Sequence, residues 1–70
     1  MPHARIFGKA GCPYTANARE AYRKQGYQIE YFDVEEDEAR MAEMVKLSGG
    51  RRAVPVIEVE GKVTVGYGGS

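Results

Sequence analysis

Apolar residues and chain breakers divide the first part of the sequence into a strand and a helix. The apolar run at residues 4–7 ends at Gly8, which is typical of a buried strand. Residues 13–25 contain no internal breaker, open with Pro13 and stop at Gly26. Because proline fits the first helical turn and glycine fits the C-terminal cap, this segment is predicted to be a helix.

The next segment, residues 28–34, alternates between two sets of apolar side chains. Ile29 and Tyr31 face one side of an extended chain, and Phe32 and Val34 face the other. We therefore expect a second strand here. A strand, a helix and a strand within about 30 residues form a βαβ unit with parallel strands and a right-handed crossover.

Residues 35–50 carry the periodicity of an amphipathic helix. Acidic residues crowd the first turn, Lys46 lies near the end, and Gly49 and Gly50 stop the helix. Its predicted apolar face, at positions i, i+3, i+4 and i+7, consists of Met41, Met44, Val45 and Ser48. We interpret the methionines as core residues and the acidic run as a solvated face.

The last predicted elements are two short strands, residues 56–60 and 62–65, which should pair as an antiparallel hairpin around Gly61. The complete order is β-α-β-α-β-β. With a cysteine before the first helix and Val54-Pro55 before the third strand, this order resembles a minimal thioredoxin fold, an α/β fold with a four-stranded mixed sheet. The fold favours a cis bond at Pro55, whereas the sheet geometry alone would accept a trans proline at a strand entry.

Length and charge narrow the possible partners. Seventy residues, 43% hydrophobic and 29% charged, suit one small soluble domain, which we expect to cover residues 1–70. Ten basic and ten acidic side chains cancel, so nothing predicts binding to nucleic acid or to an anionic membrane. The sequence shows neither a signal peptide nor a membrane-spanning apolar stretch, so we expect a cytosolic protein. It lacks a Cys/His cluster, and no metal is expected.

Cys12 is the only cysteine, which excludes an intrachain disulfide and leaves reactivity, burial or intermolecular pairing. It precedes Pro13 at the start of the predicted helix, where free amide groups and the helix dipole stabilise an anion, and Lys9 lies just upstream. These neighbours favour a reactive thiolate with a lowered pKa over a buried, inert thiol. Because the chain has no second thiol, an external thiol must resolve any mixed disulfide.

Three segments together resemble the glutaredoxins across essentially the whole chain. They are IFGKAGCPYT around the cysteine, KLSGGRRAVPVIEV before and within the third strand, and VTVGYGGS at the end. The resemblance is closest to very small bacterial glutaredoxin-like proteins, a group that includes members with selenocysteine at the nucleophile position. It implies thiol-disulfide exchange with glutathione as the cosubstrate and Cys12 as the nucleophile.

The resemblance also implies a set of glutathione-binding residues, namely Lys9, Tyr14, Thr15, Arg51, Arg52, Val54, Pro55, Gly68, Gly69 and Ser70. Within this set, the basic side chains would face the glutathione carboxylates and the Val54 backbone would pair with the cysteinyl part of the tripeptide. The last three residues would bind the γ-glutamyl end. Alternatives stay open at this point, because Arg51 and Arg52 can also be solvated loop charges and Tyr14 an exposed ring.

Three positions depart from the family pattern. Thr15 stands where dithiol members have a second cysteine, so we expect no two-cysteine mechanism and a dispensable Thr15 in glutathione mixed-disulfide chemistry. Ala53 replaces a common threonine, and Gly68-Gly69 replaces an acidic pair that would bind the glutathione ammonium. The family usually adds a further helix after this point, so we expect a partly uncovered sheet face and a monomer or weak dimer.

The leading prediction is a glutathione-dependent monothiol oxidoreductase acting on glutathionylated or disulfide substrates, and two other functions stay open. In one, two Cys12 thiolates and two glutathiones would bind a [2Fe-2S] cluster between protomers, although Pro13 makes the loop unlike the glycine-containing loop of cluster carriers. In the other, the protein would be a thiol redox partner or peroxide reductase with another donor, as the altered γ-glutamyl end suggests.

Overall fold

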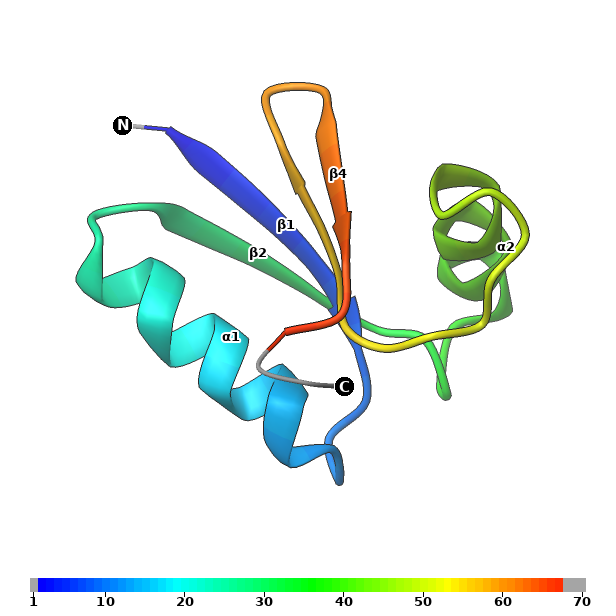
Figure 1. Cartoon of the computed structure of the whole chain (residues 1–70). Helices are drawn as coiled ribbons and strands as arrows, with labels where there is room; N and C mark the ends of the chain where they lie inside the picture. Colours follow the sequence, from blue (N-terminus) through cyan, green and yellow to red (C-terminus); the bar gives the residue numbers. More distant parts are fainter. Residues whose placement is uncertain (1, 68–70) are drawn as a thin grey trace.

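The computed structural model, which describes residues 2–67, contains the six predicted elements in the predicted order (Figure 1). They are β1 (His3–Gly8), α1 (Pro13–Lys24), β2 (Gln28–Asp33), α2 (Glu38–Leu47), β3 (Val56–Val59) and β4 (Lys62–Val65). A side-chain cap explains where α2 begins. Asp37 caps α2, because its Oδ1 accepts the amides of Ala39 and Arg40 at 3.1 and 3.3 Å. Neither α1 nor α2 is long and apolar enough to cross a membrane.

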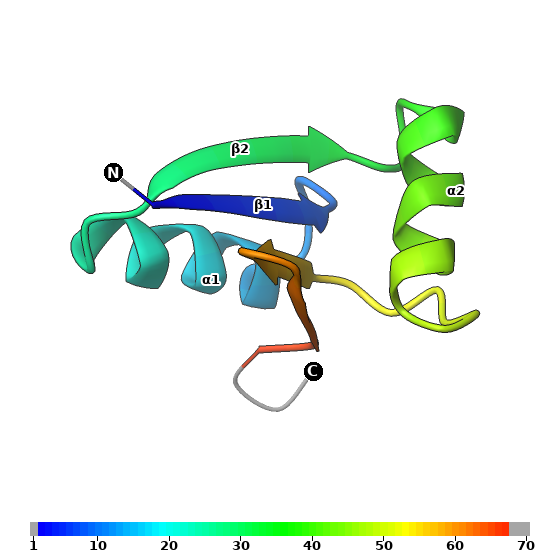
Figure 2. The same ribbon diagram turned by 90° about the horizontal axis from the view of Figure 1, so that it is seen from above.

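The four strands form one mixed sheet, as predicted for the minimal thioredoxin fold, and the structure gives their order as β2-β1-β3-β4. β1 runs parallel to β2, with Gly8 opposite Asp33, and antiparallel to β3, with Phe7 opposite Val56. The ends of β1 and β2 therefore meet the start of β3 at one edge of the sheet. Seen from above, α1 runs along one face of the sheet, while α2 stands across this edge (Figure 2).

Two hydrophobic clusters fill the two faces of the sheet. The cluster on the α1 face has Ile6, Ala18 and Ile57 at its centre, with Ile29 and Tyr31 packed against them. The cluster on the α2 face has Phe7, Val34, Met44 and Val56 at its centre, with Phe32, Met41 and Val45 packed against them. The predicted segregation of side chains along β2 is confirmed, and so is the predicted apolar face of α2 for Met41, Met44 and Val45. Ser48 lies just beyond α2 as its C-cap.

Arg5 and two glutamates form a charged cluster beside the aromatic rings on the α2 face of the sheet. Arg5 of β1 donates hydrogen bonds to Glu43 of α2 and to Glu58 of β3, each at 2.5 Å. Its guanidinium also lies over the rings of Phe7 and Phe32, 5.2 and 5.4 Å from their centroids. Arg5 thus joins α2 to two strands and shields the aromatic pair from solvent.

Aromatic residues partly cover the α1 face beside β3 and β4, where further cover would be expected from a third helix. Residues 2–67 contain two helices, and Tyr22 of α1 packs against Tyr27 at 5.2 Å and Tyr67 at 6.5 Å. Ile57, in the same cluster, is only 1% exposed. A hollow of about 330 Å³ remains between these tyrosines and the hairpin. The prediction of a monomer or weak dimer stays a prediction.

Candidate active site

Cys12 lies at the point where the loop after β1 becomes α1. Its amide donates to the Lys9 carbonyl at 3.1 Å, and its own carbonyl accepts the Ala16 amide at 3.2 Å. Cys12 is therefore the N-cap of α1, with Pro13 at the first helical position as predicted. The residue is 8% exposed, so it is largely buried but retains some access to solvent.

Opposing effects act on the pKa of Cys12. Burial raises this pKa, since it disfavours the charged form. The Thr15 amide, the Thr15 hydroxyl and the Tyr14 amide lower the pKa by donating to the thiolate, and the positive charge of Lys9 lowers it further. The donors prevail and the pKa of Cys12 lies below its usual value. The local neighbours named from the sequence thus act in the predicted direction.

Thr15 occupies a position that the sequence did not indicate. Its side chain is 1% exposed, and Oγ1 has no hydrogen-bond partner within residues 2–67. It packs against the backbone of Gly8 at the end of β1. The structure places Thr15 beneath the surface beside Cys12, and its predicted contact with glutathione stays a prediction.

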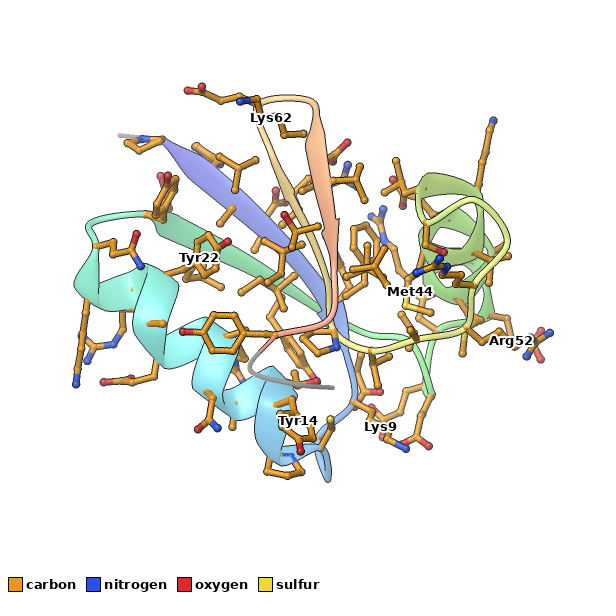
Figure 3. All side chains as sticks on the ribbon, viewed as in Figure 1. Lys9, Tyr14, Tyr22, Met44, Arg52 and Lys62 are labelled. Carbon is orange, nitrogen blue, oxygen red and sulfur yellow. The ribbon has the colours of Figure 1, made fainter. Side chains whose placement is uncertain are left out.

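Four other residues of the predicted site belong to the same edge of the sheet. Lys9, in the loop between β1 and α1, is half-buried, and Tyr14, in the first turn of α1, is 38% exposed (Figure 3). The predicted cis bond between Val54 and Pro55 is present. Because Val56 pairs with Phe7, these two residues enter β3 at the edge from which the Cys12 loop leaves β1.

Arg51 and Arg52 follow α2 in an exposed turn. Ser48 holds this turn, because its Oγ donates to the Arg51 carbonyl at 2.7 Å and accepts the Arg51 amide at 3.1 Å. Arg52 lies on the α2 side of the molecule (Figure 3) and lines a groove of about 690 Å³. The rest of that groove is lined by Val34, Glu35, Glu38, Met41, Ala42 and Val45. Gly68, Gly69 and Ser70 lie outside the described residues.

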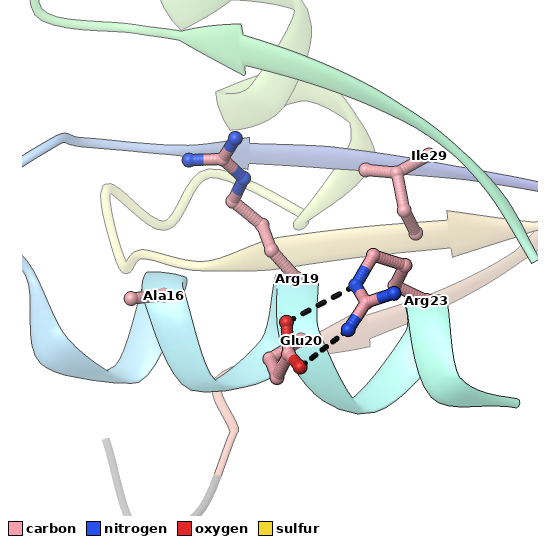
Figure 4. A pocket seen from close by; sticks show the side chains of 5 residues that line it. All are labelled: Ala16, Arg19, Glu20, Arg23 and Ile29. Carbon is pink, nitrogen blue, oxygen red and sulfur yellow. Dashed lines mark hydrogen bonds and ion pairs between the residues drawn. The ribbon is translucent and has the colours of Figure 1, made fainter.

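A second hollow, of about 230 Å³, lies on α1 beside β2. Glu20 and Arg23 form an ion pair at 2.6 Å on its rim, and Arg19 points away from this pair (Figure 4). The Arg19 guanidinium instead lies 4.2 Å from the centroid of the Tyr31 ring. None of the residues that line this hollow belongs to the predicted site.

Sequence reasoning missed two residues near the cysteine. Gly8 was interpreted only as the end of a strand, and Tyr31 only as an apolar residue of β2. The Tyr31 hydroxyl is buried and has no hydrogen-bond partner within the described chain. Burial and then Asp33 raise the pKa of Tyr31, and the Cys12 thiolate raises it further. The local sequence indicates neither role, because Gly8 meets Thr15 of α1, and Tyr31 approaches Cys12, only in the folded protein.

Comparison with known proteins agrees with this geometry. The glutaredoxin family model matches residues 4–64. The chain belongs to the glutaredoxin family. A crystal structure of a glutaredoxin from Archaeoglobus fulgidus superposes with a TM-score of 0.81 at 23% identity, over 97% of this chain and 78% of that one. A buckwheat glutaredoxin in complex with glutathione gives 0.75 at 20% identity, over 93% of this chain and 61% of that one. Among curated proteins, none matches.

Membership in the glutaredoxin family makes the protein a thiol-disulfide oxidoreductase, an enzyme whose chemistry depends on a cysteine thiolate. The two solved glutaredoxins share the thioredoxin-like arrangement of a four-stranded sheet and helices. Within residues 2–67, no three His, Cys, Asp or Glu side chains gather as they would around a metal ion. A cluster ligated by one thiolate from each protomer would not require such a group, so the absence of a metal stays a prediction.

Proposed function

We propose that this glutaredoxin is a glutathione-dependent monothiol oxidoreductase that adds glutathionyl groups to proteins or removes them, with Cys12 as the nucleophile. One observation carries the proposal. The only thiol of the chain belongs to the N-cap residue of the first helix, where nearby donors and Lys9 outweigh burial and lower its pKa. A lowered pKa supplies the thiolate that thiol-disulfide exchange requires.

The proposed reaction has two exchange steps. The Cys12 thiolate attacks the glutathionyl sulfur of a protein mixed disulfide, which forms a Cys12–glutathione disulfide and releases the protein thiolate. A second glutathione thiolate then attacks the glutathionyl sulfur, releasing Cys12 and forming glutathione disulfide. Overall, the protein thiol is reduced, one free glutathione is consumed, and it leaves joined to the former glutathionyl group as glutathione disulfide. The second step must be external, because the chain has no other cysteine.

The remaining site residues are proposed to hold the tripeptide along the edge where β1 and β2 end and β3 begins. Lys9 is half-buried and would attract a glutathione carboxylate. The Tyr14 ring would line the proposed glutathione-binding surface at this edge of the sheet. Val54 would offer backbone hydrogen bonds ahead of Pro55, as strand-like peptide binding requires. Arg51, Arg52, Thr15, Gly68, Gly69 and Ser70 complete the proposed set.

A second candidate is the same exchange chemistry with another low-molecular-weight thiol as donor. The groove beside Arg52 favours it, because Glu35 and Glu38 line the same groove. A glutathione carboxylate that reached the guanidinium would also meet two carboxylates. Like charges in one site weaken binding, whereas a donor with a neutral or cationic end would avoid this repulsion.

A coupled assay with a glutathionylated peptide tests the proposal and separates the two donors. The wild-type protein should turn over with glutathione, and Cys12→Ser should retain less than about one tenth of the activity, because a serine hydroxyl does not ionise at neutral pH. The same assay with cysteamine, a thiol bearing an amine and no carboxylate, tests the second candidate. A lower KM for cysteamine than for glutathione would place the other donor first, and turnover by Cys12→Ser would contradict the assignment of the nucleophile.

A further inference from the structure

The Thr15 hydroxyl is an unusual group in this structure. The side chain is 1% exposed, and Oγ1 has no hydrogen-bond partner within residues 2–67. Buried hydroxyls in folded proteins are nearly always hydrogen-bonded, since an unpaired one has lost its water without replacement. Thr15 therefore requires an explanation other than packing, because a valine would fill the same space without the unpaired oxygen.

The position of Thr15 in α1 indicates that the Cys12 sulfur is the partner its hydroxyl can gain. Cys12 is the N-cap of α1, and Thr15 is the third helical residue, whose amide an N-cap side chain normally accepts. The Cys12 side chain makes no such cap hydrogen bond in the structure. A thiol is a weak acceptor, whereas a thiolate is an anion that accepts strongly. Ionisation of Cys12 therefore turns its sulfur into a cap for the helix and into an acceptor for the Thr15 hydroxyl.

Gly8 determines whether Thr15 can sit at this depth. A Cβ on Gly8 would lie 2.4 Å from Thr15 Cγ2 and 2.6 Å from Oγ1, distances that real side chains do not adopt. The backbone of Gly8 cannot easily retreat. It pairs with Asp33 in the sheet, and its carbonyl accepts the Val34 amide at 2.9 Å. The missing side chain at residue 8 is thus what allows β1 and the first turn of α1 to approach this closely.

We propose that Thr15 is a positioning residue whose buried hydroxyl is satisfied only by the Cys12 thiolate, and that Gly8 provides the space that keeps this hydroxyl against the sulfur. The inference rests on the proposed role of Cys12, and it replaces the sequence-based expectation that Thr15 is dispensable. In a mixed disulfide the sulfur is no longer an anion and the hydroxyl loses its acceptor again. The arrangement therefore favours release of Cys12 as a thiolate when an external thiol attacks. Lys9 and Tyr31 are the other titratable groups that act on the sulfur or respond to it.

The pH dependence of Cys12 alkylation by iodoacetamide tests the role of Thr15 without any glutathione. Thr15→Val keeps the shape and removes the hydroxyl, and Thr15→Ser, the matched control, keeps the hydroxyl. At a pH below the wild-type midpoint, alkylation of Thr15→Val should be about tenfold slower, since a hydrogen bond to a charged group is of that size. Thr15→Ser should stay within about threefold. At pH 10, where every thiol is ionised, Thr15→Val should be no slower than the wild type, because a thiolate of higher pKa is the stronger nucleophile.

Thermal unfolding shows whether the variants fold and tests the same idea separately. At acidic pH, where Cys12 is protonated, Thr15→Val should unfold at a temperature at least as high as the wild type, because it lacks an unpaired hydroxyl. At alkaline pH this order should reverse. An alkylation profile of folded Thr15→Val that superposes on that of the wild type would overturn the proposal. Because glutathione takes no part, this result would leave the proposed function intact.

Gly8→Ala tests the second half of the inference. It should raise the alkylation midpoint and lower the unfolding temperature, because the new methyl group displaces Thr15. Adding Thr15→Ala should recover stability while the alkylation midpoint stays high, which separates packing from the hydroxyl. Gly11→Ala is the matched control in the same loop, because nothing lies within 4 Å of a Cβ built there. If folded Gly8→Ala titrates like Gly11→Ala, the assignment of Gly8 is wrong.

Discussion

The lowered pKa of Cys12 predicts that protein stability depends on pH in a window where few other groups titrate. Burial raises this pKa, and the Thr15 and Tyr14 amides, the Thr15 hydroxyl and Lys9 outweigh that effect. The folded protein therefore loses its thiol proton at a lower pH than the unfolded chain, in which a cysteine has a pKa of about 8.5. The comparison that isolates this proton is wild type against Cys12→Ser, since serine does not titrate in the window.

The size of the effect follows from the single cysteine. Between the folded and unfolded pKa values, the unfolded state holds up to one more proton than the folded state. The free energy of unfolding then rises by up to about 1.4 kcal/mol per pH unit. The contribution is complete above the unfolded pKa and is lost as the pH falls through the folded pKa. A chain of this length is expected to have a total stability of only about 4 to 10 kcal/mol, so the slope should be measurable.

Other shifted groups titrate outside this window. Burial raises the pKa values of Tyr22 and Tyr31, so these groups act at alkaline pH, with the opposite sign. Arg5 and Arg40 lower the pKa of Glu43, which therefore acts below about pH 4.3, the usual value for glutamate. Because the tyrosines and Glu43 are present in both proteins, subtracting the Cys12→Ser curve largely removes their contribution.

Urea unfolding at a series of pH values, with a non-thiol reductant and far-ultraviolet circular dichroism, gives the required curves. We expect the difference between wild type and Cys12→Ser to rise with pH and to level off above about pH 8.5. The pH at which the rise begins reports the folded pKa. A difference that stays constant from pH 6 to pH 9, or that falls, would refute the argument that the helix terminus and its neighbours stabilise the thiolate.

Two further predictions concern the core and the proposed glutathione site. Arg5→Met keeps the apolar stem but removes the bonds to Glu43 and Glu58, so it should lower the free energy of unfolding in urea at pH 7 by about 1 to 2 kcal/mol. The deficit should shrink in acid as Glu43, whose pKa Arg5 and Arg40 lower, gains its proton. The exposed control Arg23→Met should have a much smaller effect. Gly69→Asp would return a carboxylate for the glutathione ammonium and should lower the glutathione KM about tenfold. An unchanged KM in the folded variant would argue against glutathione as the donor.

The strands and helices could be predicted because their signals are local. Pro13 and Gly26 mark the ends of one helical segment, and alternation in residues 28–34 separates the side chains of the two sheet faces. The parallel first pair follows from the crossover and the antiparallel last pair from the hairpin, whereas one joined mixed sheet was expected from the resemblance to the thioredoxin fold. The interaction of Arg5 with both aromatic rings was not predictable in this way. It depends on strands and a helix that meet only after folding, and an isolated arginine in a strand carries no such signal.

In the candidate site, too, the features that depend on neighbours in sequence could be predicted, and those that depend on the fold could not. Lys9, Cys12 and Tyr14 are close in sequence, so a helix N-terminus and a nearby charge were enough to predict a lowered pKa. The contact between Gly8 and Thr15 could not be inferred from residue types. Glycine after an apolar run is normally a breaker, and threonine in a first turn is normally solvated. Only the packing of the start of α1 against the end of β1 shows that Gly8 lacks a side chain at the point where Thr15 needs space.

The balance of forces on Cys12 also bears on how one thiol can serve as both nucleophile and leaving group. A lower pKa increases the thiolate population and improves the leaving group, but it reduces the intrinsic nucleophilicity of the sulfur. Burial is the largest influence on this thiol, and it raises the pKa. The thiolate is thus held in a partly desolvated position by a few fixed donors instead of by water. In the proposed mechanism, Thr15 would stabilise the thiolate by donating a hydrogen bond. Because it cannot form a disulfide, it would offer no internal route of resolution, which would leave the second step to the external thiol.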